Sequence, residues 1–145
     1  MNTGKVIIAV IFSLMAFFAV SESYAATLKE EFELQERCGK RAEEWFKSEW
    51  GNGISSDKDG QTRASYRNHY NSKLNKCFVL LTSAIYEKDR TSYTDMELFD
   101  VNEQKGYGSF WEKFGVGQPQ SCEVGNVPCL SEKEWNSLVT PYMGD

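Results

Sequence analysis

Four cysteines constrain the fold of this 145-residue chain more than any other feature of its sequence. An even number of cysteines in a small chain is typical of an exported protein with disulfides, so we expect two disulfide bonds. A zinc site would favour tight Cys-x2-Cys pairs, whereas these cysteines are more widely spaced, and we expect no metal site. Three pairings are possible, and we favour the one that joins Cys38 to Cys77 and Cys122 to Cys129.

The first 25 residues predict export. Lys5 is followed by an apolar run over residues 6–20 and then by Ser23 and Ala25, small residues at the spacing of a cleavage site. This is the pattern of a secretory signal peptide. A membrane anchor is the alternative, but a helix needs about 20 apolar residues to span a bilayer. We therefore expect a signal peptide over residues 1–25, no membrane insertion of the mature chain, and a single disulfide-stapled domain over residues 26–145.

Charge and motifs exclude several classes of function. The formal net charge is −5, and because nucleic-acid affinity depends mainly on cationic contacts, we expect no nucleic-acid partner. The chain has no nucleophile elbow, HExxH, phosphate-binding glycine loop or Cys-x-x-Cys, so we expect no cofactor. Asp57, Asp59 and Gly60 resemble part of a calcium loop, but Ser55 and Tyr66 occupy its first and closing positions.

The segment from Leu28 to Trp50 predicts an amphipathic helix with one buried stripe. Its apolar side chains cover less than half of the helix circumference, and Glu, Lys and Arg occupy the opposite face. Gly51 and Gly53 are expected to end the helix. The apolar positions are Leu28, Phe32, Leu34, Cys38, Ala42, Trp45, Phe46 and Trp50.

The rest of the chain predicts antiparallel strands and a second helix. Residues 54–62 are polar and predict a loop, whereas Ala64–Asn71 and Lys76–Tyr86 flank a turn-forming sequence, which is typical of a β-hairpin. Residues 96–101 and 107–114 predict another hairpin, and Cys122–Cys129 a tight turn closed by its own cysteines.

A short helix should follow the last cysteine. Ser131 with Glu134 three residues later is a capping-box pattern, and Pro141 should end or kink the helix. The predicted architecture is an α+β domain with an N-terminal amphipathic helix, an antiparallel sheet of about four or more strands, a short C-terminal helix and two disulfides.

The first hairpin contains the only histidine of the chain, His69. If Ser72–Asn75 form the loop, Tyr70 lies opposite Cys77 and His69 lies on the face that points away from the first helix, with Arg67, Asn71 and Phe78. A slip of one residue would reverse this assignment. The helix-facing positions would be Tyr66, Asn68, Tyr70, Cys77, Val79 and Leu81.

His69 has two interpretations. Its reference pKa lies near neutrality, so it could be a general acid or base of a small hydrolase, with Arg67 and with Glu97, Asp100 or Glu103. A structural or binding role is the alternative, and we assign no catalytic residue. The candidate binding surface is Tyr66, Arg67, His69, Tyr70 and Asn71.

Several stretches resemble a group of small exported bacterial proteins. The similar features are a helix cysteine, a Tyr…HYNxxLxKCF hairpin, an acidic DVNE turn and a C-terminal Cys–helix–YM ending. The resemblance implies the same fold and cysteine pattern, and no particular activity. It marks Cys38, Tyr66, His69, Tyr70, Asn71, Leu74, Lys76, Cys77 and Phe78.

We expect a non-enzymatic, periplasmic or secreted protein that binds a protein, an envelope component or a small ligand. An exposed patch drawn from Tyr66, Tyr70, Tyr107, Phe110 and Trp111 would favour this function. One alternative is a ribonuclease-like secreted hydrolase that uses His69. Another is an inhibitor of a foreign enzyme such as lysozyme, whose constrained loop between Cys122 and Cys129 enters an active site.

Overall fold

The computed structural model describes residues 28–144, so the predicted signal peptide lies outside the described residues. The chain divides into two units, Met1–Leu34 and Gln35–Asp145. Of the first unit only residues 28–34 are described, and they are helical. The helix continues to residue 50 in the second unit, and we call it the Cys38 helix.

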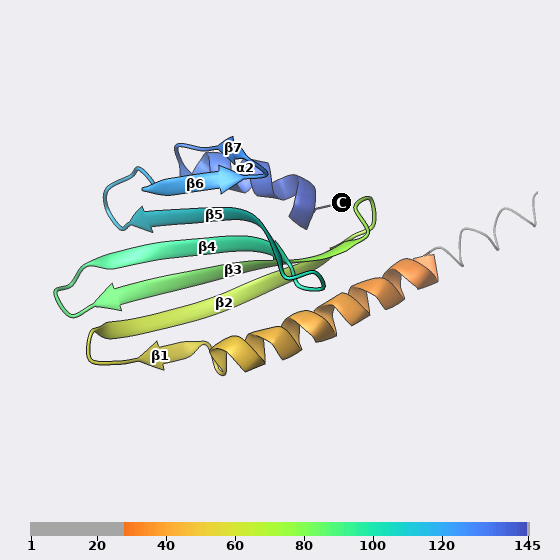
Figure 1. Ribbon diagram of the computed structural model, residues 1–145, viewed down its shortest axis with the longest axis horizontal. Coiled ribbons are helices and arrows are strands. Elements are labelled where there is room, and N and C mark those ends of the chain that lie inside the picture. Colours follow the sequence, from red (N-terminus) through yellow and green to blue (C-terminus); the bar gives the residue numbers. More distant parts are fainter. Residues whose placement is uncertain (1–27, 145) are drawn as a thin grey trace, which may run out of the picture. The chain divides into compact units, whose positions relative to one another are not determined.

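The second unit is built on one antiparallel sheet. Its seven strands follow one another in chain order across the sheet, from β1 to β7, so that each pairs with its neighbour in sequence (Figure 1). The predictions of an antiparallel sheet and of a short helix after it are confirmed. The strands are β1 Ile54–Ser56, β2 Gly60–Asn71, β3 Lys76–Glu87, β4 Ser92–Asp100, β5 Lys105–Lys113, β6 Ser121–Val124 and β7 Val127–Pro128, and the C-terminal helix is α2 Glu132–Met143.

The predicted register of the first hairpin is confirmed. Tyr70 pairs with Cys77 and Asn71 with Lys76 across the β2–β3 turn. Because side chains alternate along a strand, this register assigns each residue of β3 to one of two faces. Cys77 faces the Cys38 helix, and Phe78 faces α2.

The two helices cover opposite faces of the sheet. The Cys38–Cys77 disulfide fastens the first helix to β3, and Phe46 packs on Tyr66 of β2 with ring centroids 4.6 Å apart. On the other face, Phe78 meets Tyr142 of α2 edge-on. Each face of the sheet therefore carries one helix.

The main core lies on the α2 face. Trp135 is fully buried and packs near Phe110 of β5, and the Cys122–Cys129 disulfide lies beside it. The predicted pairing of all four cysteines is thus present. The buried residues of this core are Phe78, Leu80, Met96, Leu98, Phe110, Cys122, Val124, Cys129, Trp135 and Val139.

The ends of α2 explain its position. Ser131 caps the helix, because its Oγ accepts a hydrogen bond from the Glu134 amide at 3.2 Å. The Glu134 carboxylate accepts from the Leu130 amide rather than from Ser131, so only half of the predicted capping box forms. Pro141 does not end the helix, which continues to Met143. Asn71 holds this end to the hairpin by donating to the Pro141 and Tyr142 carbonyls.

Two local predictions were wrong. Residues 54–62 are not all loop, because Ile54–Ser56 form an edge strand paired with Gln61–Arg63. Such a strand is held by backbone pairing, which leaves little trace in the side-chain pattern.

The apolar stripe of the Cys38 helix is buried at Cys38 and Ala42, whereas Phe32 is 70% exposed. Periodicity marks an apolar face but does not supply an element to cover it.

Glycine is required at position 108 by the packing of the α2 core. A Cβ at Gly108 would lie 2.8 Å from the Glu123 carbonyl oxygen and 3.1 Å from the Trp135 ring. Gly108→Ala should therefore lower the free energy of unfolding by about 1–3 kcal/mol, measured by urea denaturation. Gly106→Ala is the control on the same strand, because a Cβ there meets nothing within 4 Å. Equal stability of the two variants would contradict this packing.

Candidate functional site

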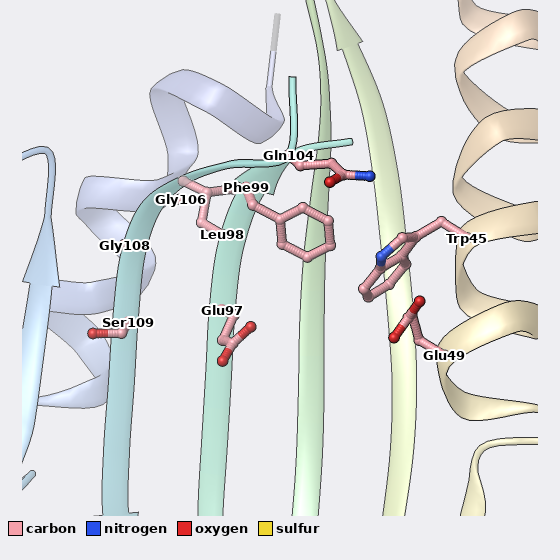
Figure 2. Close-up of a pocket in the computed structure, with 9 residues that line it drawn as sticks. All are labelled: Trp45, Glu49, Glu97, Leu98, Phe99, Gln104, Gly106, Gly108 and Ser109. Atoms are coloured by element: carbon pink, nitrogen blue, oxygen red, sulfur yellow. The ribbon is translucent and has the colours of Figure 1, made fainter. Parts of the chain in front are cut away.

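A groove opens where the Cys38 helix stops covering the sheet. Its volume is about 550 Å³, and it lies between the helix and strands β4 and β5 (Figure 2). Trp45 and Glu49 reach into it from the helix, and Phe99 and Glu97 from the sheet. The remaining lining residues are Leu98, Gln104, Gly106, Gly108 and Ser109.

An aromatic pair forms the end of the groove nearest the helix. The Trp45 ring meets the Phe99 ring edge-on, with centroids 4.6 Å apart. The Trp45 side chain remains half-buried, so part of the indole is available to a ligand. Glu49 follows Trp45 by four residues, which puts both side chains on one face of the helix.

A β-bulge hollows the floor of the groove. Phe99 pairs with Gly106 and Leu98 with Gly108, so Tyr107 is the extra residue of β5. The Tyr107 ring packs against Phe78 on the α2 face, at 5.1 Å between centroids. The position beside Phe99 is therefore occupied by a glycine with open space above it. Bulges are frequent next to functional sites because they redirect side chains in this way.

Carboxylates line the same face of β4. Asp95 and Glu97 are two residues apart, so both point to the side of the sheet on which the groove lies. Burial raises the pKa of Asp95 above its ordinary value, and the nearby Glu97 charge raises it further. Beside Asp95, the rings of Tyr93 and Trp111 are stacked at 5.0 Å. This face thus combines aromatic rings with negative charge.

The residues of the predicted binding surface lie on both faces of the sheet. Tyr66 and Tyr70 point toward the Cys38 helix, where Tyr66 packs on Phe46 and the Tyr70 hydroxyl donates to Asn75. Arg67, His69 and Asn71 are on the α2 face according to the register. The five residues therefore do not form one continuous surface.

The ring patch that would favour binding is also divided. Phe110 is fully buried, and Tyr107 packs between Phe78 and Tyr142 on the α2 face. Trp111 lies on the opposite face, stacked on Tyr93. The aromatic surface that remains beside a cavity comes from Trp45 and Phe99 instead.

The carboxylates proposed for a hydrolase are separated from His69 or are paired with lysine. Glu97 lies on the opposite face from His69. Asp100 is buried, and its Oδ2 lies 3.2 Å from Lys76 Nζ. Glu103 lies 2.7 Å from the same ammonium. Glu103 and Asp100 accordingly hold the pKa of Lys76 above its ordinary value, which indicates a structural ion-pair network.

The Cys122–Cys129 loop is a rigid hairpin, as its sequence indicates. Gly125 and Asn126 both have positive φ, as in the two-residue turns that join twisted antiparallel strands. The disulfide closes the hairpin, and Cys129 N–H donates to the Cys122 carbonyl. Val127 and Leu130 are exposed large apolar side chains on it or next to it.

Comparison with known proteins identifies no relative of the chain. No family model, curated protein or solved structure matches it.

The described part of the chain contains neither a metal-binding cluster nor a membrane-spanning helix. Between residues 28 and 144, no three His, Cys, Asp or Glu side chains are grouped so that they could hold a metal ion. Over the same range, the helices are too short or too polar to cross a membrane.

The raised pKa of Asp95 has a measurable consequence for stability. A carboxyl group whose pKa is raised by folding favours the folded state when protonated and costs stability when ionised. Asp95→Asn should therefore raise the melting temperature at pH 7, and this gain should vanish as the pH falls below the unfolded pKa of about 3.9.

Asp57→Asn is the control with opposite sign. Asp57 accepts hydrogen bonds from the Asp59 and Gly60 amides, which lower its pKa. This substitution should lower the melting temperature at pH 7 and lose its effect in acid. A lower melting temperature of Asp95→Asn at pH 7 would contradict the environment described for Asp95.

The Cys38–Cys77 bond should contribute more stability than the second disulfide. Its cysteines are 39 residues apart, against 7 for Cys122 and Cys129. The chain-entropy relation gives about 4 kcal/mol for the long loop and about 2.5 kcal/mol for the short one. Cys38→Ser/Cys77→Ser should therefore unfold at lower urea concentration than Cys122→Ser/Cys129→Ser. The reverse order would contradict this assignment.

Proposed function

We propose that this chain is an exported, non-enzymatic binding protein whose ligand site is the groove beside Trp45. The observation that carries the proposal is the edge-on contact of Trp45 with Phe99, which forms an aromatic wall in a concavity of about 550 Å³. Ligand sites are typically concave, with aromatic walls and a few polar groups. Glu49, Glu97, Gln104 and Ser109 are the polar residues of this groove.

Export is supported by the signal-like sequence and by chemistry. Two disulfides are compatible with an oxidising location, because thiols are kept reduced in the cytosol. The Cys38–Cys77 bond also holds the helix that forms one side of the groove. Binding and export are therefore linked in this proposal, since the site depends on a bond that oxidising conditions preserve.

A catalytic role for His69 has less support. The imidazole is half-buried on the α2 face and does not belong to the lining of the groove. Asp100 and Glu103 are both paired with Lys76, so they are poorly suited to proton transfer with His69. A binding function requires none of these groups to react.

The second candidate function is inhibition of a foreign enzyme by the β6–β7 hairpin. Its disulfide limits the conformational entropy lost on binding, and Val127 is 49% exposed. This candidate differs from the first in the surface that it uses, which allows one experiment to separate them.

Blocking the groove should abolish binding without unfolding the protein. Gly106→Leu adds a side chain where a Cβ would meet no other atom within 4 Å, so the new side chain fits without a clash at its base. Immobilised wild type should retain a partner from envelope extract, and Gly106→Leu should lose it at unchanged melting temperature. Ser65→Leu, on an exposed position of β2, is the control and should retain the partner.

The outcomes distinguish the two candidates. Equal retention by Gly106→Leu and wild type would contradict the groove as the site. Retention that survives Gly106→Leu but is lost in Val127→Asp would instead favour the inhibitory hairpin.

A further inference from the structure

The groove carries negative charge that no cation of its lining balances. Glu49 and Glu97 approach it from the helix and from β4, and none of its lining residues is Lys, Arg or His. In the described residues, the ion pairs use other carboxylates, so Glu49 and Glu97 have no cationic partner. A cleft lined by charge of one sign concentrates ions of the opposite sign.

The aromatic wall narrows the choice of cation. Trp45 is half-buried and lies next to Glu49 in the groove, whereas Glu97 lines the same groove from β4, on the far side of the Phe99 ring (Figure 2). An indole face is the best aromatic partner for a cation, and a planar guanidinium can stack on it while donating paired hydrogen bonds to a carboxylate. Calcium would require six or more oxygen ligands, mostly from several carboxylates, whereas between residues 28 and 144 no three His, Cys, Asp or Glu side chains are grouped so that they could hold a metal ion.

We propose that the groove binds an arginine side chain of a basic protein partner, with the guanidinium against Trp45 and between Glu49 and Glu97. This inference rests on the proposed binding function and specifies its ligand. The chain has a formal net charge of −5, so it attracts a basic protein at long range. Gly106 and Ser109 on β5 are exposed, which leaves the sheet side of the groove open to a partner's backbone.

The position of the bulge supports a side chain entering from outside. The bulge turns Tyr107 to the α2 face and makes Gly106 the residue of β5 that pairs with Phe99. Since glycine has no side chain, the floor of the groove is open at this position. The apolar stem of an arginine can lie over this floor while its charged end reaches the carboxylates. Asp95 lies two residues before Glu97 on β4, and its pKa is raised mainly by burial and further by the Glu97 charge.

The test uses small peptides that differ only in the proposed group. The probes are acetyl-Gly-Arg-Gly-amide, its citrulline analogue, which is neutral but nearly the same shape, its lysine analogue, and spermidine. Binding to the full mature protein is followed by NMR, through the indole N–H signal of Trp45. The arginine peptide should shift this signal, and the citrulline peptide should bind at least about tenfold more weakly.

Charge variants identify the residues that recognise the peptide. Glu49→Gln and Glu97→Gln should each weaken the arginine peptide about fivefold to tenfold. Glu87→Gln removes an equal charge from an exposed position at the far end of β3 and should leave affinity unchanged. Gly106→Leu should abolish binding while the spectrum remains that of a folded protein.

Each result decides for or against the inference. Equal binding of the citrulline peptide, equal or tighter binding of spermidine or the lysine peptide, or wild-type affinity of Glu97→Gln would overturn arginine recognition. If these occur while Gly106→Leu still loses its partner in the extract, the binding function stands and the ligand is different. If Gly106→Leu retains its partner as well, both proposals fail.

Discussion

The disulfide between Cys38 and Cys77 is the constraint on which the rest of the second unit depends. It fastens the helix to the face of β3 that lies opposite α2, and the sheet thereby gains a cover on each face. A chain of this size has a modest core, so a covalent link contributes a large part of its stability. The same bond positions Trp45 over Phe99, and the groove exists because the helix covers only part of the sheet.

Much of this fold could be predicted from the sequence because the signals are local. The four residues of the SKLN turn determine the register of β2 and β3, and this register puts Cys77 on the helix side. The helix period puts Cys38 in the apolar stripe, so both sulfurs point toward each other. Local patterns did not predict β1, because this strand is held by backbone pairing with β2. They also predicted burial of Phe32, whose side chain is exposed.

The candidate site could be predicted only in fragments. The sequence marks Glu97 as a candidate carboxylate and Trp45 as one apolar position of the helix. Nothing in the sequence indicates that the two side chains line the same groove. Their proximity depends on the crossing of the helix over the sheet and on the bulge at Tyr107, both of which are tertiary features. A weak sign was present: two glycines, Gly106 and Gly108, within one strand are unusual and often mark a bulge or a close approach. Conversely, the residues around His69 lie on two faces of the sheet, because side chains alternate between the faces along a strand.

The central claim is that the helix is held against the sheet so that Trp45 and Phe99 form one wall of a groove. The most direct measurement is the set of nuclear Overhauser effects between the indole protons of Trp45 and the ring protons of Phe99 in the oxidised protein. With centroids 4.6 Å apart, strong cross-peaks are expected. Absence of these cross-peaks, with a Trp45 indole N–H that exchanges with water as fast as in a free peptide, would contradict the account.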